Sequence, residues 1–182
     1  LSDERGLDTE TALQRGQLIH LLLENLPARP ESDWPVLATH LLSPINQACG
    51  AVDKAALLSE ATVLLTKPDL RRIFTTEALA EVDVSADLPS LGGRRVHGTI
   101  DRLVIDKAEV LAIDFKSNVA VPSEVAHCPE GILRQMAAYA EALQQIYPDH
   151  KITMAILWTK TATLMSLPDR LLSDALSRAD VS

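Results

Sequence analysis

The stretch GTIDRLVIDKAEVLAIDFKS, residues 98–117, predicts two strands joined by a tight turn. Residues 98–105 and 109–116 are rich in branched apolar residues and alternate with period 2, and the polar residues 106–108 between them are typical of a reversal. Strands joined by so short a connection pair antiparallel. The stretch therefore predicts a β-hairpin.

Three charged side chains interrupt the apolar pattern of this hairpin. Asp114 and Lys116 project from one face of the second strand, because they are two residues apart. Antiparallel pairing about the turn sets Asp101 across from the 113–114 region, within reach of a shared metal ion. Charges at the end of an apolar strand are costly unless they pair or bind something. A surface salt bridge between Asp114 and Lys116 is the other interpretation of that pair.

Two carboxylates and a lysine are the set that metal-dependent phosphodiester cleavage requires. The oxygens of Asp101 and Asp114 suit Mg²⁺ or Mn²⁺. A bound ion lowers the pKa of a water ligand and neutralises charge on the phosphorane. Lys116 would then orient the attacking water or stabilise the oxyanion.

Two helical patterns carry further candidate residues. The N-terminal pattern places Gly16 and His20 four residues apart, on one helix face. A later amphipathic helix, residues 130–147, places Gln135 and Tyr139 at the same spacing. A histidine packed in the core, and a glutamine and tyrosine without special function, remain the alternatives.

In chain order, these motifs read GxxxH, AEV, GTIDRL, DFK and QxxxY. This ordered set resembles the RecB-type nuclease branch of the PD-(D/E)XK superfamily, most closely the C-terminal nuclease domains of AddA-type helicase–nuclease subunits. The resemblance runs from about Gly16 to Leu167. It implies an α/β, restriction-endonuclease-like fold with a mixed central sheet flanked by helices and a helical N-terminal part.

The resemblance also implies a metal centre. His20, Asp101 and Asp114 would be metal ligands, and the backbone carbonyl of Phe115 would complete the protein's share. The metal would be Mg²⁺, with Mn²⁺ as a substitute.

Further roles follow from the same resemblance. Lys116 would be the catalytic lysine, and Gln135 and Tyr139 would belong to a helix that supports the site and meets the DNA strand. Glu81, in the AEV motif, matches the acidic position on the strand before the metal strands. Glu77 is close enough in the sequence to be a rival for that position.

The implied activity is that of an exonuclease-type deoxyribonuclease in double-strand-break repair by recombination. Its substrate would be DNA, mainly single strands from unwound duplex. Its protein partners would be helicase domains of the same chain and an AddB-like subunit. Its location would be the bacterial cytoplasm. Some RecB-type members hold an iron–sulfur cluster on four cysteines. With only Cys49 and Cys128, this chain cannot build that cluster.

Composition fits one domain, residues 1–182, with a mainly helical part at 1–76 and an α/β catalytic core at 77–178. The polar ends and the initial Leu1 suggest a module of a longer helicase–nuclease chain. No apolar run is long enough for a bilayer, and no signal-peptide pattern is present. The net charge of −8 predicts weak DNA binding by the module alone.

The sequence predicts a helical first half of the chain and a second half that contains both strands and helices. Helices are expected at about 9–26, 33–48, 53–66, 68–75, 130–147 and 168–178, and strands at 79–84, 95–105, 109–116, 152–159 and 162–167.

Two other functions stay open. The chain could be a catalytically inactive nuclease-fold module with a DNA- or protein-binding role, although Asp101, Asp114 and Lys116 are all present. It could also be an unrelated α/β hydrolase or a regulatory domain in which DFK is a surface salt bridge. No GxSxG, HExxH or GxxxxGK[ST] motif supports such a competing site.

Overall fold

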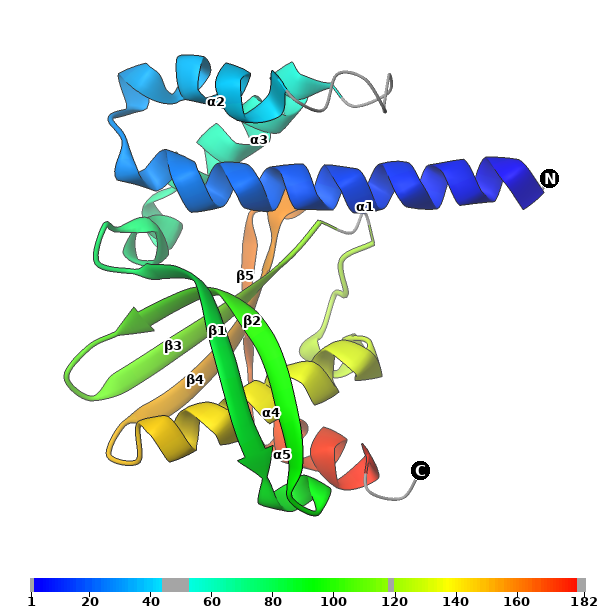
Figure 1. Ribbon diagram of the computed structural model, residues 1–182, viewed down its shortest axis with the longest axis vertical. Coiled ribbons are helices and arrows are strands. Elements are labelled where there is room, and N and C mark those ends of the chain that lie inside the picture. Colours follow the sequence, from blue (N-terminus) through cyan, green and yellow to red (C-terminus); the bar gives the residue numbers. More distant parts are fainter. Residues whose placement is uncertain (1, 44–52, 118–119, 180–182) are drawn as a thin grey trace. The chain divides into compact units, whose positions relative to one another are not determined.

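A computed structural model describes residues 2–43, 53–117 and 120–179 (Figure 1). The helices are α1 (Ser2–Asn25), α2 (Trp34–Leu42), α3 (Lys54–Thr66), α4 (Glu130–Ile146) and α5 (Asp169–Ala179). The strands are β1 (Leu79–Leu88), β2 (Arg94–Ile105), β3 (Glu109–Lys116), β4 (Lys151–Trp158) and β5 (Thr163–Leu167). Short 3₁₀ helices include η4 (Pro68–Phe74), η5 (Pro89–Leu91) and η7 (Thr159–Thr161).

The strands form one sheet in the order β1-β2-β3-β4-β5. The pairs β1–β2 and β2–β3 are antiparallel. The amide of Lys151, the first residue of β4, donates to the carbonyl of Ala108, the residue just before β3, at 2.9 Å. The two strands therefore begin side by side and run in the same direction. The sheet is therefore mixed, and the predicted α/β fold class with a helical N-terminal part is confirmed.

Several elements differ from the predicted bounds. α1 begins well before residue 9, in a polar stretch without apolar periodicity. The segment at 68–75 forms the 3₁₀ helix η4 rather than an α-helix. β1 continues beyond residue 84, because its polar residues pair with the start of β2. The end of the helix expected at 33–48 lies outside the described residues.

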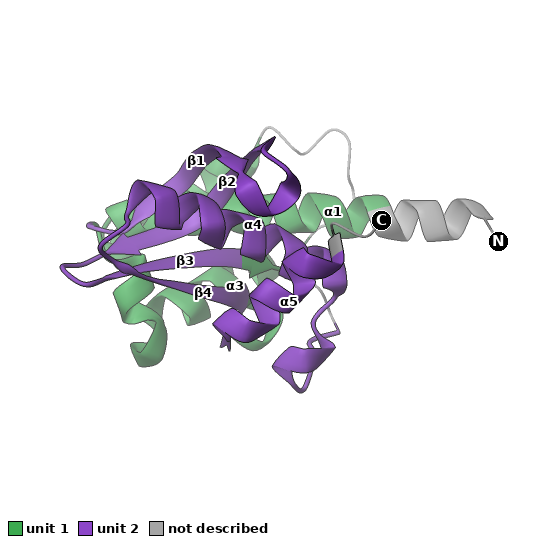
Figure 2. Cartoon of the chain, turned by 90° about the horizontal axis from the view of Figure 1, so that it is seen from below, with its two compact units in different colours: residues 1–76, 115–119, 158–163 green, residues 77–114, 120–157, 164–182 purple. Residues whose placement is uncertain are grey.

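The chain divides into two compact units (Figure 2). Unit 1 comprises residues 1–76, 115–119 and 158–163, and unit 2 comprises residues 77–114, 120–157 and 164–182. Each unit therefore draws on several stretches of the chain. In particular, β3 ends in unit 1 although most of the strand belongs to unit 2.

Unit 1 is built around the apolar face of α1. Leu22 and Leu23 are fully buried, as are residues of α2 and α3 that pack against this helix. Trp34, at the start of α2, donates from Nε1 to the carbonyl of Leu26 at 2.9 Å, which fixes the connection after α1. Asp53 caps α3 by accepting from the amides of its first turn.

Unit 2 packs α4 and α5 together beside the sheet (Figure 1). Most residues of β3 and β4 are buried on both faces, as expected for central strands. The guanidinium of Arg178 in α5 donates to both carboxylate oxygens of Glu130, at 2.9 and 3.0 Å, and so ties the end of α5 to the start of α4. Among the described residues, no helix combines the length and apolar character needed to cross a bilayer.

Candidate metal centre

Glu81 and Asp101 face each other across two neighbouring strands of unit 2. The β1–β2 register pairs Ala80 with Arg102, which sets Glu81 opposite Asp101. One carboxylate oxygen of each lies within 4.8 Å of the other. Two acidic groups held this close repel each other unless a cation or proton donors compensate them.

Asp114 extends this arrangement to a third strand. The β2–β3 register pairs Arg102 with Ile113, so the next step along the ladder places Asp101 opposite Asp114. Opposed residues of an antiparallel pair project to the same face of the sheet. Asp101 is half-buried and the Asp114 side chain is only 4% exposed. Three carboxylates thus form one row across β1, β2 and β3, here called the carboxylate row: Glu81, Asp101 and Asp114.

The backbone of Glu81 is unusual. Its φ is 51°, in the left-handed region, which costs a residue with a Cβ roughly 1–3 kcal/mol. Such conformations persist where the surrounding structure enforces them, and they cluster at functional sites. Here the deviation falls at the acidic member of the AEV motif, opposite Asp101.

Unit 1 holds a second group of predicted site residues. Nε2 of His20, on α1, lies 3.1 Å from the backbone carbonyl oxygen of Phe115, within hydrogen-bonding distance. The two rings also meet edge to face, with centroids 5.5 Å apart, and the centroid of the Phe74 ring lies 6.0 Å from that of Phe115. The imidazole is therefore fixed against the end of β3.

Gly16 permits this close approach of α1 to the chain after β3. A Cβ at Gly16 would lie 2.9 Å from Oγ of Ser117, which is closer than real side chains come. Gly16 and His20 are one helical turn apart, so the contact at Ser117 and the contact at Phe115 use the same face of α1.

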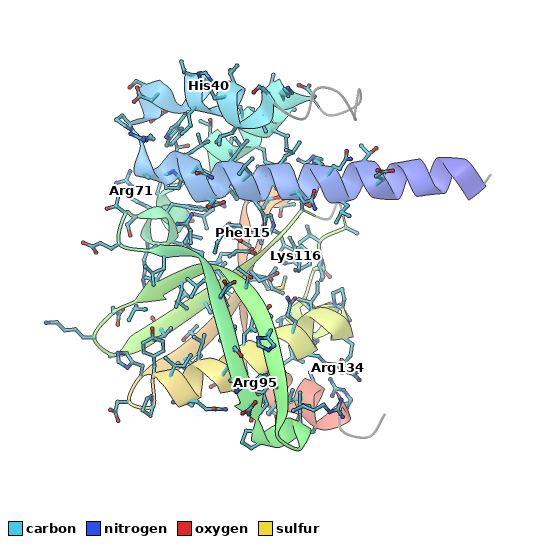
Figure 3. The ribbon with its side chains drawn as sticks, viewed as in Figure 1. His40, Arg71, Arg95, Phe115, Lys116 and Arg134 are labelled. Atoms are coloured by element: carbon cyan, nitrogen blue, oxygen red, sulfur yellow. The ribbon has the colours of Figure 1, made fainter. Side chains whose placement is uncertain are left out.

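Lys116 is half-buried and follows Phe115 at the end of β3 (Figure 3). Strand alternation directs it to the same face as Asp114, two residues earlier. The lysine thus leaves the strand on the side of the carboxylate row.

Gln135 and Tyr139 interact with each other on α4. Nε2 of Gln135 donates to the Tyr139 hydroxyl at 3.1 Å, and Tyr139 is buried against β2. A Cβ at Gly98 would lie only 2.1 Å from that hydroxyl oxygen and 2.6 Å from the ring. By strand alternation, Gly98 shares its face with Ile100 and not with Asp101.

Sequence reasoning did not identify Gly98 as a packing position. The first residue of GTID occurs in a strand, where glycine often marks a close approach of another chain segment. That signal was available, but the partner, Tyr139, lies 41 positions further along the chain.

The chain is similar to known proteins in three comparisons. A family model described as the PD-(D/E)XK nuclease superfamily matches residues 1–165. The threonine–tRNA ligase of Haloarcula marismortui is 31% identical over 102 residues, which is 54% of this chain and 15% of the ligase, so the chain spans a small part of that relative's length. The solved structure of the protein SSO0001 is 15% identical, with a TM-score of 0.37, over 87% of this chain and 73% of that chain.

The family match covers nearly the whole chain, including the helix with His20, the carboxylate row, Lys116 and the helix with Gln135 and Tyr139. The chain belongs to the PD-(D/E)XK nuclease superfamily.

Proposed function

We propose that this chain is a nuclease domain that hydrolyses phosphodiester bonds of DNA with a divalent metal ion, Mg²⁺ or Mn²⁺. The observation that carries the proposal is the carboxylate row, in which Asp101 and Asp114 lie on adjacent strands with Lys116 two residues further along. The superfamily membership supports the same reaction class.

The donor atoms fit such an ion. Around Mg²⁺, with oxygens at 2.0–2.1 Å, adjacent ligands of an octahedron are about 3.0 Å apart and opposite ligands about 4.2 Å. The 3.1 Å between Nε2 of His20 and the Phe115 carbonyl oxygen matches adjacent ligands. The Glu81 and Asp101 oxygens lie at most 4.8 Å apart, so they need to move together only slightly to reach the distance of about 4.2 Å between opposite ligands.

Covalent geometry joins the two groups of ligands. Asp114 of the carboxylate row and Phe115 are consecutive residues, with Cα atoms about 3.8 Å apart. We therefore propose one metal centre held by Asp101, Asp114, His20 and the Phe115 carbonyl, with Glu81 as a supporting acid. A mixed set of carboxylates and one imidazole suits Mg²⁺ and suits Mn²⁺ better.

The protein's side chains supply the rest of the chemistry. When bound, the ion would acidify a water molecule and offset charge on the phosphate. The Lys116 ammonium, on the face of Asp114, would hold the attacking water or stabilise the oxygen that gains charge. Asp101 and Asp114 would fix the position of the ion, because both come from paired central strands that cannot shift independently.

The proposal extends to the biological setting. We propose that the domain acts on single strands delivered by helicase domains of the same polypeptide, with an AddB-like partner, during double-strand-break repair in the bacterial cytoplasm. The ordered motifs from Gly16 to Leu167 support this branch of the superfamily. Weak intrinsic DNA binding, expected from the net charge of −8, suits a domain whose strand is fed to it.

A cleavage assay tests the central proposal. End-labelled single-stranded DNA is incubated with the chain and Mg²⁺ or Mn²⁺, with EDTA as the control, and with the variant Asp101→Asn. We expect cleavage that requires the metal and is lost in the variant. Cleavage that survives EDTA, or that the variant retains, would contradict the proposal, and shortened products from one end would identify an exonuclease.

A further inference from the structure

A hollow in unit 1 contains polar groups that the proposed metal centre does not use. It has a volume of about 410 Å³ and lies between α3 and the loop that contains η7. Its walls include Ser59 and Glu60 from α3, and Thr159, Lys160 and Thr161 from the loop. One ammonium and three hydroxyl groups thus line a small surface depression.

Cations from two other elements hold this depression in shape. Arg15 of α1 donates from Nη2 to Oε2 of Glu60, and Nζ of Lys160 lies 3.7 Å from the same oxygen. Nζ of Lys67 donates to the carbonyl of Ala162 at 2.6 Å, where the backbone takes the left-handed conformation with φ of 50°. Two positive charges, Arg15 and Lys160, therefore lie beside the Glu60 carboxylate, and a third, Lys67, binds the backbone of the loop.

Among the described residues, two buried donors of this cluster have no acceptor. Nη1 of Arg15 and Oγ1 of Thr159 are both buried without a hydrogen-bond partner, and Thr159 is only 1% exposed. Oε1 of Glu60 also lacks a donor, but its charge is matched by Arg15 and Lys160. Buried donors without partners are rare in folded proteins, and they point to a ligand that accepts hydrogen bonds.

We propose that Lys160, Thr159 and Arg15 bind a backbone phosphate of the DNA strand close to the phosphate that is cleaved. Lysine, arginine and hydroxyl side chains make most protein contacts to DNA phosphates. The proposal rests on the proposed nuclease function, since it assigns a second contact to the same substrate.

The position on α1 suits a neighbouring phosphate. Arg15 precedes His20 by five residues, or about 7.5 Å along the helix axis. The two side chains leave the helix about 140° apart around its axis, so the spacing places both contacts on one helix and does not set the number of nucleotides between them. Arg15 is also next to Gly16, which contacts Ser117, the residue after Lys116.

The test compares two lysine variants of the whole chain in strand binding. Lys160→Gln removes the exposed ammonium of the hollow, and Lys107→Gln removes an exposed ammonium from the β2–β3 turn as the matched control. Affinity for a fluorescent oligothymidylate is measured without metal at several salt concentrations. We expect Lys160→Gln to weaken binding about fivefold and to lower the salt slope by about 0.7, with Lys107→Gln unchanged.

Equal affinities for all three proteins, equal weakening in both variants, or no strand binding by the wild type would each overturn the phosphate contact. The metal-dependent cleavage assay separates this failure from that of the nuclease proposal. Normal cleavage with no effect of Lys160→Gln would remove the contact alone. Strand binding that depends on Lys160, without any cleavage, would remove the nuclease activity and keep the contact.

Discussion

Unit 1 and unit 2 differ in net charge as well as in secondary structure. Unit 1 has nine Lys and Arg residues against ten Asp and Glu, whereas unit 2 has eight against fifteen. Most of the negative charge of the chain therefore belongs to unit 2, which carries the carboxylate row. A net charge calculated for the whole chain hides this division.

Three of the eight Lys and Arg residues of unit 2 form ion pairs with its own acids in the described contacts. Nε of Arg95 lies 2.9 Å from Asp87, and Arg178 and Arg134 both lie beside Glu130. Arg102 is buried in the sheet, with its guanidinium 3.5 Å from the Ala78 carbonyl. Under the proposed function, unit 2 would supply the metal-binding carboxylates, and unit 1 would supply the lysine and the imidazole.

Asp114→Asn tests whether the carboxylate row of unit 2 is needed for cleavage. The substitution keeps the shape of a buried side chain and removes its charge. We expect cleavage to fall by at least about 10³-fold, more than the roughly 10- to 100-fold typical of losing an outer partner of a metal ligand. Asp83→Asn is the matched control, because Asp83 is exposed on the same sheet and accepts only from Thr99 in the described contacts. Equal activities of the two variants would contradict the metal assignment.

Lys116→Ala tests the role of the unit 1 lysine in turnover. We expect turnover to fall about 10²-fold, the usual scale for removing one group that stabilises developing charge. Mn²⁺ affinity, measured by calorimetry, should change little, because the ammonium is not a ligand. A variant that loses the metal but turns over normally when saturated would show that Lys116 has been given the wrong role.

His20→Ala tests whether unit 1 contributes a ligand to metal binding. Losing one of several ligands should weaken Mn²⁺ binding about tenfold or more. His40→Ala is the control, because His40 is exposed on α2 in the same unit. If His20 is only a packing residue, thermal stability will fall while Mn²⁺ affinity stays at the wild-type value.

Gly98→Ala tests how β2 and α4 fit together within unit 2. The added methyl would overlap the Tyr139 ring and hydroxyl, so the ring must move, at a cost of about 1–3 kcal/mol in the free energy of unfolding. Gly131→Ala is the control, because a methyl there meets nothing within 4 Å. In helix α4 that change should stabilise by up to about 1 kcal/mol. Denaturant unfolding of both variants measures the difference, and equal stabilities would show that Tyr139 adapts freely.

The smallest effect concerns the ends of α4 and α5. The hydrogen bond from Arg178 lowers the pKa of Glu130. A lowered pKa in the folded state stabilises the protein above the ordinary glutamate pKa, and this contribution is lost as pH falls through the folded value. Glu130→Gln should therefore be slightly less stable than wild type at neutral pH and equal to it in acid. Thermal melts across this pH range measure the gap, and a gap that persists in acid would contradict the account.

The hairpin at residues 98–117 shows what the sequence could predict. Period-2 alternation and a polar turn predicted both strands, and the observed pairing of Arg102 with Ile113 agrees with the expected position of Asp101 opposite the 113–114 region. Local patterns sufficed there because the signal, alternation and turn, lies within neighbouring residues.

Features that depend on distant contacts were not predictable in the same way. The left-handed backbone of Glu81 has no sequence signal, because glutamate rarely adopts it. The start of α1 lies among charged residues without an apolar stripe. The cluster of Arg15, Glu60 and Lys160 joins three elements whose packing no local pattern encodes. The predicted ligand roles of the site residues stay predictions.

Diffraction from crystals soaked in Mn²⁺, with anomalous data collected near the manganese edge, tests the central claim most directly. The account predicts an anomalous peak bound by Asp101 and Asp114, with Nε2 of His20 and the Phe115 carbonyl oxygen as further ligands. Lys116 should lie near the peak without touching it. A well-soaked crystal with no peak at the carboxylate row, or with manganese bound by other residues, would contradict the account.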